Sequence, residues 1–164
     1  MPNTMSKKEL EDLHFVHAGE IRQAGRGCDV QVQDLKGCVL YVWRVDGRVQ
    51  KFGSTYSLKV RMTDNKRTIN DLLDFQDGRP PRTSAPTHVR WLERFARGAT
   101  DKFQQQAPGL IRAGKVIEVW ATSRFSPTCP DPGRKGQCPT CVDLESLLNR
   151  RYQTIQYGWA SREH

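Results

Sequence analysis

Hydrophobic and β-branched residues gather in three short runs that predict strands. The run CVLYVWRV at residues 38–45 is followed by Asp46-Gly47 and then by RVQKF at residues 48–52. Asp-Gly supplies the positive φ angles of a tight turn, so these residues predict a hairpin of two antiparallel strands. The run KVIEVWAT at residues 115–122 predicts a third strand.

Apolar residues at helical spacing occupy much of the remaining chain. The pattern from Ser6 to His17 predicts a helix, because Ser6 and Glu9 have the spacing of a capping box. Further helices are expected to start at four positions: after Gly53, near Thr68, after Thr87 and at Asp143. The polar residues 20–36 predict a connector, and the segments 77–87 and 123–141 predict loops rich in proline and glycine.

These elements predict an α+β domain in which a small antiparallel three-stranded sheet is flanked by helices. We expect the domain to span residues 37–155, with an insertion at about 77–112. Residues 1–36 are expected to form an N-terminal helical extension and its connector, and residues 156–164 a short tail.

The net charge of the chain indicates which class of molecule it could bind. The 164 residues carry 26 Lys and Arg against 18 Asp and Glu, a formal net charge of +8. Such an excess is typical of proteins that bind a polyanion, although an inert basic surface has the same composition. No apolar run reaches the roughly 18 residues of a membrane helix, and the N-terminus lacks the apolar stretch of a secretory signal. We therefore expect a cytoplasmic protein that binds nucleic acid and no membrane.

Four residues in and after the predicted hairpin carry a resemblance to a known family. The first strand contains Leu40-Tyr41-Val42, or Val39-Leu40-Tyr41 in the stricter alignment, and the second contains Lys51-Phe52-Gly53. Arg61 lies eight residues after Gly53, and Glu145 opens a later Glu-x-x-Leu helix. This order and spacing resemble the GIY-YIG nuclease family, as a restriction-like or phage stand-alone member, with Lys51 where the family usually has its second tyrosine.

The resemblance implies a metal-dependent endonuclease that hydrolyses DNA phosphodiester bonds with Mg²⁺ or another divalent cation. Glu145 would hold the metal ion, and Arg61 would stabilise charge on the phosphate in the transition state. Tyr41 would donate a hydrogen bond to the phosphate, or act as a base if neighbouring cations lower its pKa, with Lys51 as its electrostatic partner. One such site cuts one strand, so double-strand cleavage would need a homodimer or two encounters.

Each of these residues also has a structural interpretation. Tyr41 can be ordinary strand packing, Arg61 a solvated helix residue, and Glu145 a charge that complements the helix N-terminus. Two other functions therefore remain open: a DNA-binding module that keeps the fold without cutting, and a zinc-stabilised domain that binds proteins.

Two further groups of residues are candidates for binding. Arginines that could contact DNA phosphates, or form a solvated helix face, are Arg79, Arg82, Arg90, Arg94, Arg97, Arg150 and Arg151. Cys129, Cys138 and Cys141 have part of the spacing of a zinc site, for which Cys28, His88 or His164 could be a fourth ligand. Without an export signal we expect the cysteines to be thiols or metal ligands rather than disulfides.

Overall fold

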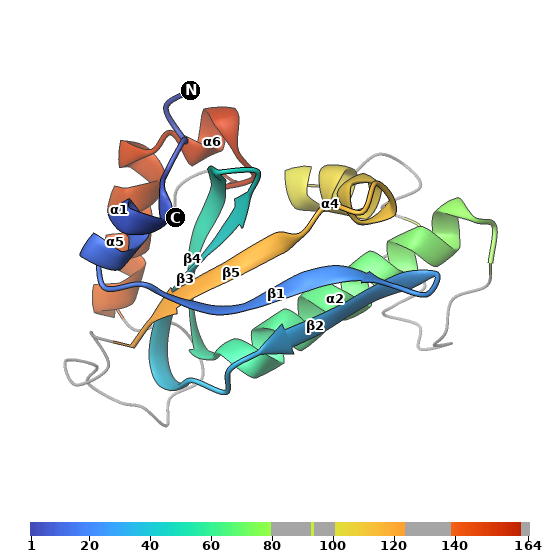
Figure 1. Cartoon of the computed structure of the whole chain (residues 1–164), viewed down its shortest axis with the longest axis horizontal. Helices are drawn as coiled ribbons and strands as arrows, with labels where there is room; N and C mark the ends of the chain where they lie inside the picture. Colours follow the sequence, from blue (N-terminus) through green and yellow to red (C-terminus); the bar gives the residue numbers. More distant parts are fainter. Residues whose placement is uncertain (80–92, 94–100, 124–138, 162–164) are drawn as a thin grey trace.

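The computed structural model describes residues 1–79, 93, 101–123 and 139–161. Its centre is one antiparallel sheet with the strand order β2-β1-β5-β3-β4 (Figure 1). The strands are β1 (Val16–Ala24), β2 (Gly27–Val32), β3 (Lys36–Val45), β4 (Arg48–Ser57) and β5 (Ile117–Thr122). The helices are α1 (Lys7–Asp12), α2 (Leu58–Gln76), α4 (Lys102–Arg112), α5 (Pro139–Arg151) and α6 (Thr154–Tyr157).

Helices cover both faces of the sheet. Alternate residues of β3 point to opposite sides, so Tyr41 and Trp43 pack with α2 and α4, whereas Leu40 and Val42 pack with α1 and α5. In Figure 1, α2 runs along the β1–β2 hairpin, and α1, α5 and α6 gather at the other end of the molecule. The result is a layered α+β domain whose two cores lie on opposite faces of one sheet.

The structure confirms the β3–β4 hairpin, and the third predicted strand is β5. The predicted count of three strands is wrong, because residues expected as a connector form β1 and β2. In these strands the apolar side is short, with Val30 and Val32 only partly buried against the core, so their alternation is weak in the sequence. At the edge strand β2, Asn70 of α2 accepts a hydrogen bond from the backbone N–H of Cys28 and donates one to its carbonyl oxygen.

The helix boundaries also differ from those expected. Helix α1 ends before His17, because His14 has a positive φ of 67° that no helix accommodates. Helix α2 continues through Thr68, since no proline or glycine interrupts it. Helix α5 begins at Pro139 instead of Asp143, and proline is tolerated in a first turn. The helix expected after Thr87 lies outside the described residues. No helix among the described residues is long and apolar enough to span a membrane.

Candidate active site

The four residues singled out by the family resemblance lie around the edge strand β4. Tyr41 is on the neighbouring strand β3, Lys51 on β4 itself, Arg61 in the first turns of α2, and Glu145 on α5. Electrostatic interactions of both Arg61 and Glu145 reach Tyr41 and Lys51. Tyr41 and Lys51 face the side of the sheet that α2 and α4 cover, whereas Glu145 comes from α5 on the other side, so these side chains interact electrostatically around the edge of β4.

Gly53 provides the surface on which the Tyr41 ring lies. The two residues are direct partners across β3 and β4. A Cβ atom on residue 53 would lie 2.5 Å from both Cζ and the hydroxyl oxygen of Tyr41. Any side chain at this position would displace the ring, so glycine lets the phenol reach across β4 to the edge of the sheet. This steric requirement is the physical reason for glycine at the end of the second triplet.

The phenol of Tyr41 is buried, and the guanidinium of Arg61 acts on it electrostatically. Burial raises the pKa of Tyr41 to about 12, and the nearby Arg61 guanidinium only partly opposes this rise. The phenol is therefore neutral at pH 7. This corrects the sequence-based option of a tyrosine base with a lowered pKa, because desolvation outweighs the neighbouring cations.

Lys51 is held against an aromatic wall. Its Nζ lies 5.9 Å from the centroid of the Trp43 ring, which stacks on Phe103 and contacts Trp159. Burial lowers the pKa of Lys51, while the carboxylates of Glu145 and Asp101 act in the opposite direction. Because the wall removes water from the ammonium group, its electrostatic interactions in this site are stronger than at an open surface.

Glu145 points from α5 toward β4. Its Oε2 accepts a hydrogen bond of 2.8 Å from the hydroxyl of Ser54, and the side chain is 6% exposed. Its Oε1 has no hydrogen-bond partner in the described part of the chain. A carboxylate fixed through one oxygen, with the other unengaged, suits a hard divalent cation that keeps positions for water and a phosphate oxygen. Glu145 thus fits a metal ligand, although the described residues contain no group of three or more potential ligands.

A register match between α5 and β4 fixes the position of Glu145. One face of α5 carries, at intervals of four residues, Cys141, Glu145 and Asn149. In the same order these residues lie beside Tyr56, Ser54 and Phe52, which are alternate residues of β4. Four helical residues rise about 6 Å, and two strand residues rise about 6.6 Å, so the contacts repeat in step.

Asn149 makes two hydrogen bonds to the backbone of β4. Its carboxamide accepts a hydrogen bond of 2.9 Å from the Phe52 backbone N–H and donates one of 3.0 Å to the Phe52 carbonyl. Thr154 donates a further hydrogen bond of 2.6 Å to the Asn149 side-chain oxygen. Because β4 is an edge strand, its outward peptide groups have no partner strand, and the Asn149 amide takes that place.

Sequence reasoning missed three residues that shape this site: Ser54, Asn149 and Asp101. Asn149 follows Glu145 by one helical turn, but its hydrogen-bond partner Phe52 is 97 positions away, so no local pattern in the sequence indicates this contact. The close contact between Gly53 and the Tyr41 ring could not be predicted either, because it depends on which residues pair across β3 and β4.

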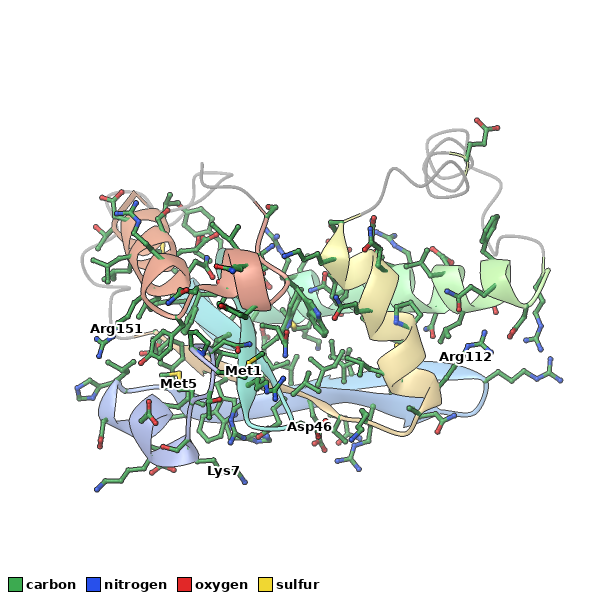
Figure 2. The ribbon with its side chains drawn as sticks, turned by 90° about the horizontal axis from the view of Figure 1, so that it is seen from above. Met1, Met5, Lys7, Asp46, Arg112 and Arg151 are labelled. Carbon is green, nitrogen blue, oxygen red and sulfur yellow. The ribbon has the colours of Figure 1, made fainter. Side chains whose placement is uncertain are left out.

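The candidate DNA-binding arginines are less well defined. Arg79 lies 3.9 Å from Asp74, and Arg150 and Arg151 are exposed at the end of α5. Figure 2 shows Arg151 at one end of the molecule and Arg112, which pairs with Asp77, at the other. The remaining candidates lie outside the described residues: Arg82, Arg90, Arg94 and Arg97. A phosphate-binding role for the whole set stays a prediction.

The cysteines differ from the expectation in one respect. Cys38 is disulfide-bonded, which corrects the expectation that all cysteines are thiols or metal ligands. Cys28 packs on β2 in the core formed with α2 and α4, whereas Cys141 packs with Cys38 in a separate small cluster. Cys28 is therefore not placed to complete a zinc site with Cys141. Cys129, Cys138, His88 and His164 lie outside the described residues.

Comparisons with known proteins give little further information. No protein-family model matches the chain, and no curated protein matches its sequence. Among solved structures, the chain is similar to the restriction endonuclease HPY188I in complex with product DNA, with 14% identity and a TM-score of 0.46. The match covers 97% of this chain and 86% of that chain. At this TM-score and identity, the likeness assigns neither a fold family nor an activity to the chain.

Proposed function

We propose that this protein is a metal-dependent endonuclease of the GIY-YIG type that hydrolyses DNA phosphodiester bonds. The observation that carries the proposal is the grouping of Tyr41, Lys51, Arg61 and Glu145 around the edge of β4. The grouping unites two cations that can stabilise charge on a phosphate, a phenol that can donate a hydrogen bond to it, and a carboxylate that can hold a metal ion to activate the attacking water.

The two cations are available to a phosphate. Within the described ranges, neither Lys51 nor Arg61 forms an ion pair with a carboxylate at 4 Å or less. Cations fixed in position before the substrate binds stabilise the extra negative charge of the phosphate in the transition state. Arg61 is the transition-state cation of this proposal, and Lys51 adds positive potential from the desolvated side.

Tyr41 acts as a neutral hydrogen-bond donor. Its proton can be donated to a non-bridging oxygen of the phosphate. The pKa of about 12 keeps that proton in place at neutral pH. Glu145 would hold a Mg²⁺ ion through Oε1, and the ion would supply Lewis-acid stabilisation when bound. Both strands of a duplex would be cut by a homodimer or in two successive encounters.

Incubation of supercoiled plasmid with the protein and Mg²⁺ tests the proposal. We expect conversion to open-circular and linear DNA, which EDTA abolishes and Glu145→Gln lowers at least about 100-fold. Asp143→Asn is the matched control, because it removes an exposed carboxylate two residues away on the same helix and should retain activity. Plasmid left uncut by the wild-type protein, or cut equally by Glu145→Gln, would overturn the proposal. Uncut DNA that is nevertheless retained in a salt-dependent manner would favour a DNA-binding module.

A further inference from the structure

The segment that follows α6 lies against the edge strand that carries Lys51. Helix α6 lies beside β4 (Figure 1), and after it the backbone N–H of Trp159 donates a hydrogen bond of 2.6 Å to the carbonyl oxygen of Gln50. A Cβ atom on Gly158 would lie 2.3 Å from that same oxygen, so glycine is what allows this close approach. The segment is thus an added backbone partner for β4, one residue from Lys51.

The side chain of Trp159 completes the aromatic wall behind Lys51. Lys51 is the direct cross-strand partner of Trp43, and its Nζ lies 5.9 Å from the centroid of that ring. The Trp159 ring centroid lies 6.0 Å from that of Trp43 and 5.7 Å from that of Phe103. Trp159 is 3% exposed, and its indole N–H donates a hydrogen bond of 2.9 Å to Oε1 of Gln106 on α4. One residue therefore contacts both the strand of Lys51 and the wall behind it.

We infer that Trp159 is a positioning residue for Lys51, because it closes the aromatic wall against water and fixes the strand that bears the ammonium group. Residues 158–160 bring no charged side chain of their own. The charged groups that act on the ammonium come from other elements: Glu145 of α5, Asp101 before α4 and Arg61 of α2. Burial has the largest influence on the pKa of Lys51 and lowers it, so a residue that excludes water governs the electrostatic effect of this group.

The inference rests on the proposed function only for its consequence in catalysis. If the wall is opened, water screens the ammonium group, and we expect the plasmid-cleavage rate of Trp159→Leu to fall about tenfold. The protonation of Lys51 is measured without DNA. A failure of the proposed nuclease activity and a failure of this inference are therefore distinguishable.

An NMR titration of Lys51 in the full chain tests the inference. The ¹³Cε signal of Lys51 is assigned as the one that is absent from Lys51→Met. We expect the wild-type pKa to lie below the ordinary lysine value of 10.5, and to rise toward that value in Trp159→Leu. Trp159→Phe keeps a ring in the wall and should keep the Lys51 pKa low. Trp120→Leu is the matched control: Trp120 is also 3% exposed, but it packs in the core on the other face of the sheet and should leave this pKa unchanged.

A second variant opens the same contact and leaves every aromatic side chain in place. In Gly158→Ala the new Cβ pushes the chain away from Gln50, so the pKa of Lys51 should rise here too, and this variant decides the question if Trp159→Leu does not fold. Three results would overturn the inference: a wild-type Lys51 that titrates at 10.5, an unchanged Lys51 pKa in either folded variant, or an equal rise in Trp120→Leu. Loss of folding in both variants would mark Trp159 as a core residue only, and would overturn it as well.

Discussion

Replacing Asn149 by alanine separates the positioning of Glu145 from the stability of the fold. The substitution removes the amide that pairs with both backbone groups of Phe52 on the edge strand. It also removes the acceptor of the Thr154 hydroxyl. Helix α5 then keeps its apolar contacts through Leu148 and Tyr152, but it loses the polar contact that sets its register one turn from Glu145.

The structure gives the size of the effect. Phe52 is fully buried, so its N–H and carbonyl are left with poor access to water. An unsatisfied buried polar group costs about 1–3 kcal/mol, and we expect Asn149→Ala to lower the free energy of unfolding by about 2–4 kcal/mol. For a chain of this length that is a fall in Tm of roughly 5–15 °C.

Asn70→Ala is the matched control for this experiment. Asn70 makes the same pair of hydrogen bonds to Cys28 on the opposite edge strand, β2, so its loss should destabilise the fold to a similar degree. The plasmid-cleavage rate is measured well below both melting temperatures. We expect Asn149→Ala to lower the rate at least about tenfold and to need more Mg²⁺ for half-maximal activity, because Glu145 is less well positioned. Asn70→Ala should cleave at nearly the wild-type rate. Equal losses in the two variants, or an unchanged Mg²⁺ requirement in Asn149→Ala, would refute the positioning role.

Three further predictions follow from the same site. Gly53→Ala should lower the cleavage rate at least about tenfold, because the new Cβ displaces the Tyr41 ring from Arg61. The far-UV circular dichroism spectrum should stay unchanged, and full cleavage activity would contradict the prediction. Because burial raises the Tyr41 pKa to about 12, the unfolded phenol ionises first as the pH passes 10, and the wild-type protein should lose up to about 3 kcal/mol of stability between pH 10 and 12. Chemical denaturation of Tyr41→Phe should show a smaller loss over that range, and an equal loss would show that Tyr41 is not the group responsible. Because burial lowers the Lys51 pKa, Lys51→Met should melt at a higher temperature at pH 7 while losing activity, and the gain in Tm should shrink as the pH approaches 10.5. A lower Tm for Lys51→Met at pH 7 would contradict the burial argument.

Local signals predicted the part of the fold that carries the site. The strand-forming run before Asp46-Gly47 gave the β3–β4 hairpin, and the Glu-x-x-Leu spacing placed Glu145 on a helix. The strands β1 and β2 escaped prediction because their polar residues outnumber the few apolar ones that face α2. Their edge is completed by Asn70, whose partner Cys28 is 42 positions away and gives no local signal.

In the candidate site, too, spacing along the chain identifies some residues, whereas other features depend on contacts that only the fold creates. Spacing along the chain selected Tyr41, Lys51, Arg61 and Glu145, but it gave no indication of the burial that raises the Tyr41 pKa. That burial changes the chemistry that we assign to the phenol from a base to a neutral donor. Long-range packing also placed Cys38 beside Cys141, a contact that the spacing of the C-terminal cysteines alone does not contain.

The central claim is that Tyr41 and Glu145 act on one scissile phosphate, and a double-mutant cycle tests it most directly. Single-turnover cleavage rates of a duplex are measured with Mg²⁺ for the wild type, Tyr41→Phe, Glu145→Gln and the double variant. Groups that act as a unit on one transition state have strongly non-additive effects, so the double variant should be little slower than the slower single variant. If the two losses multiply, or if either single variant cleaves at the wild-type rate, the two side chains do not share a phosphate.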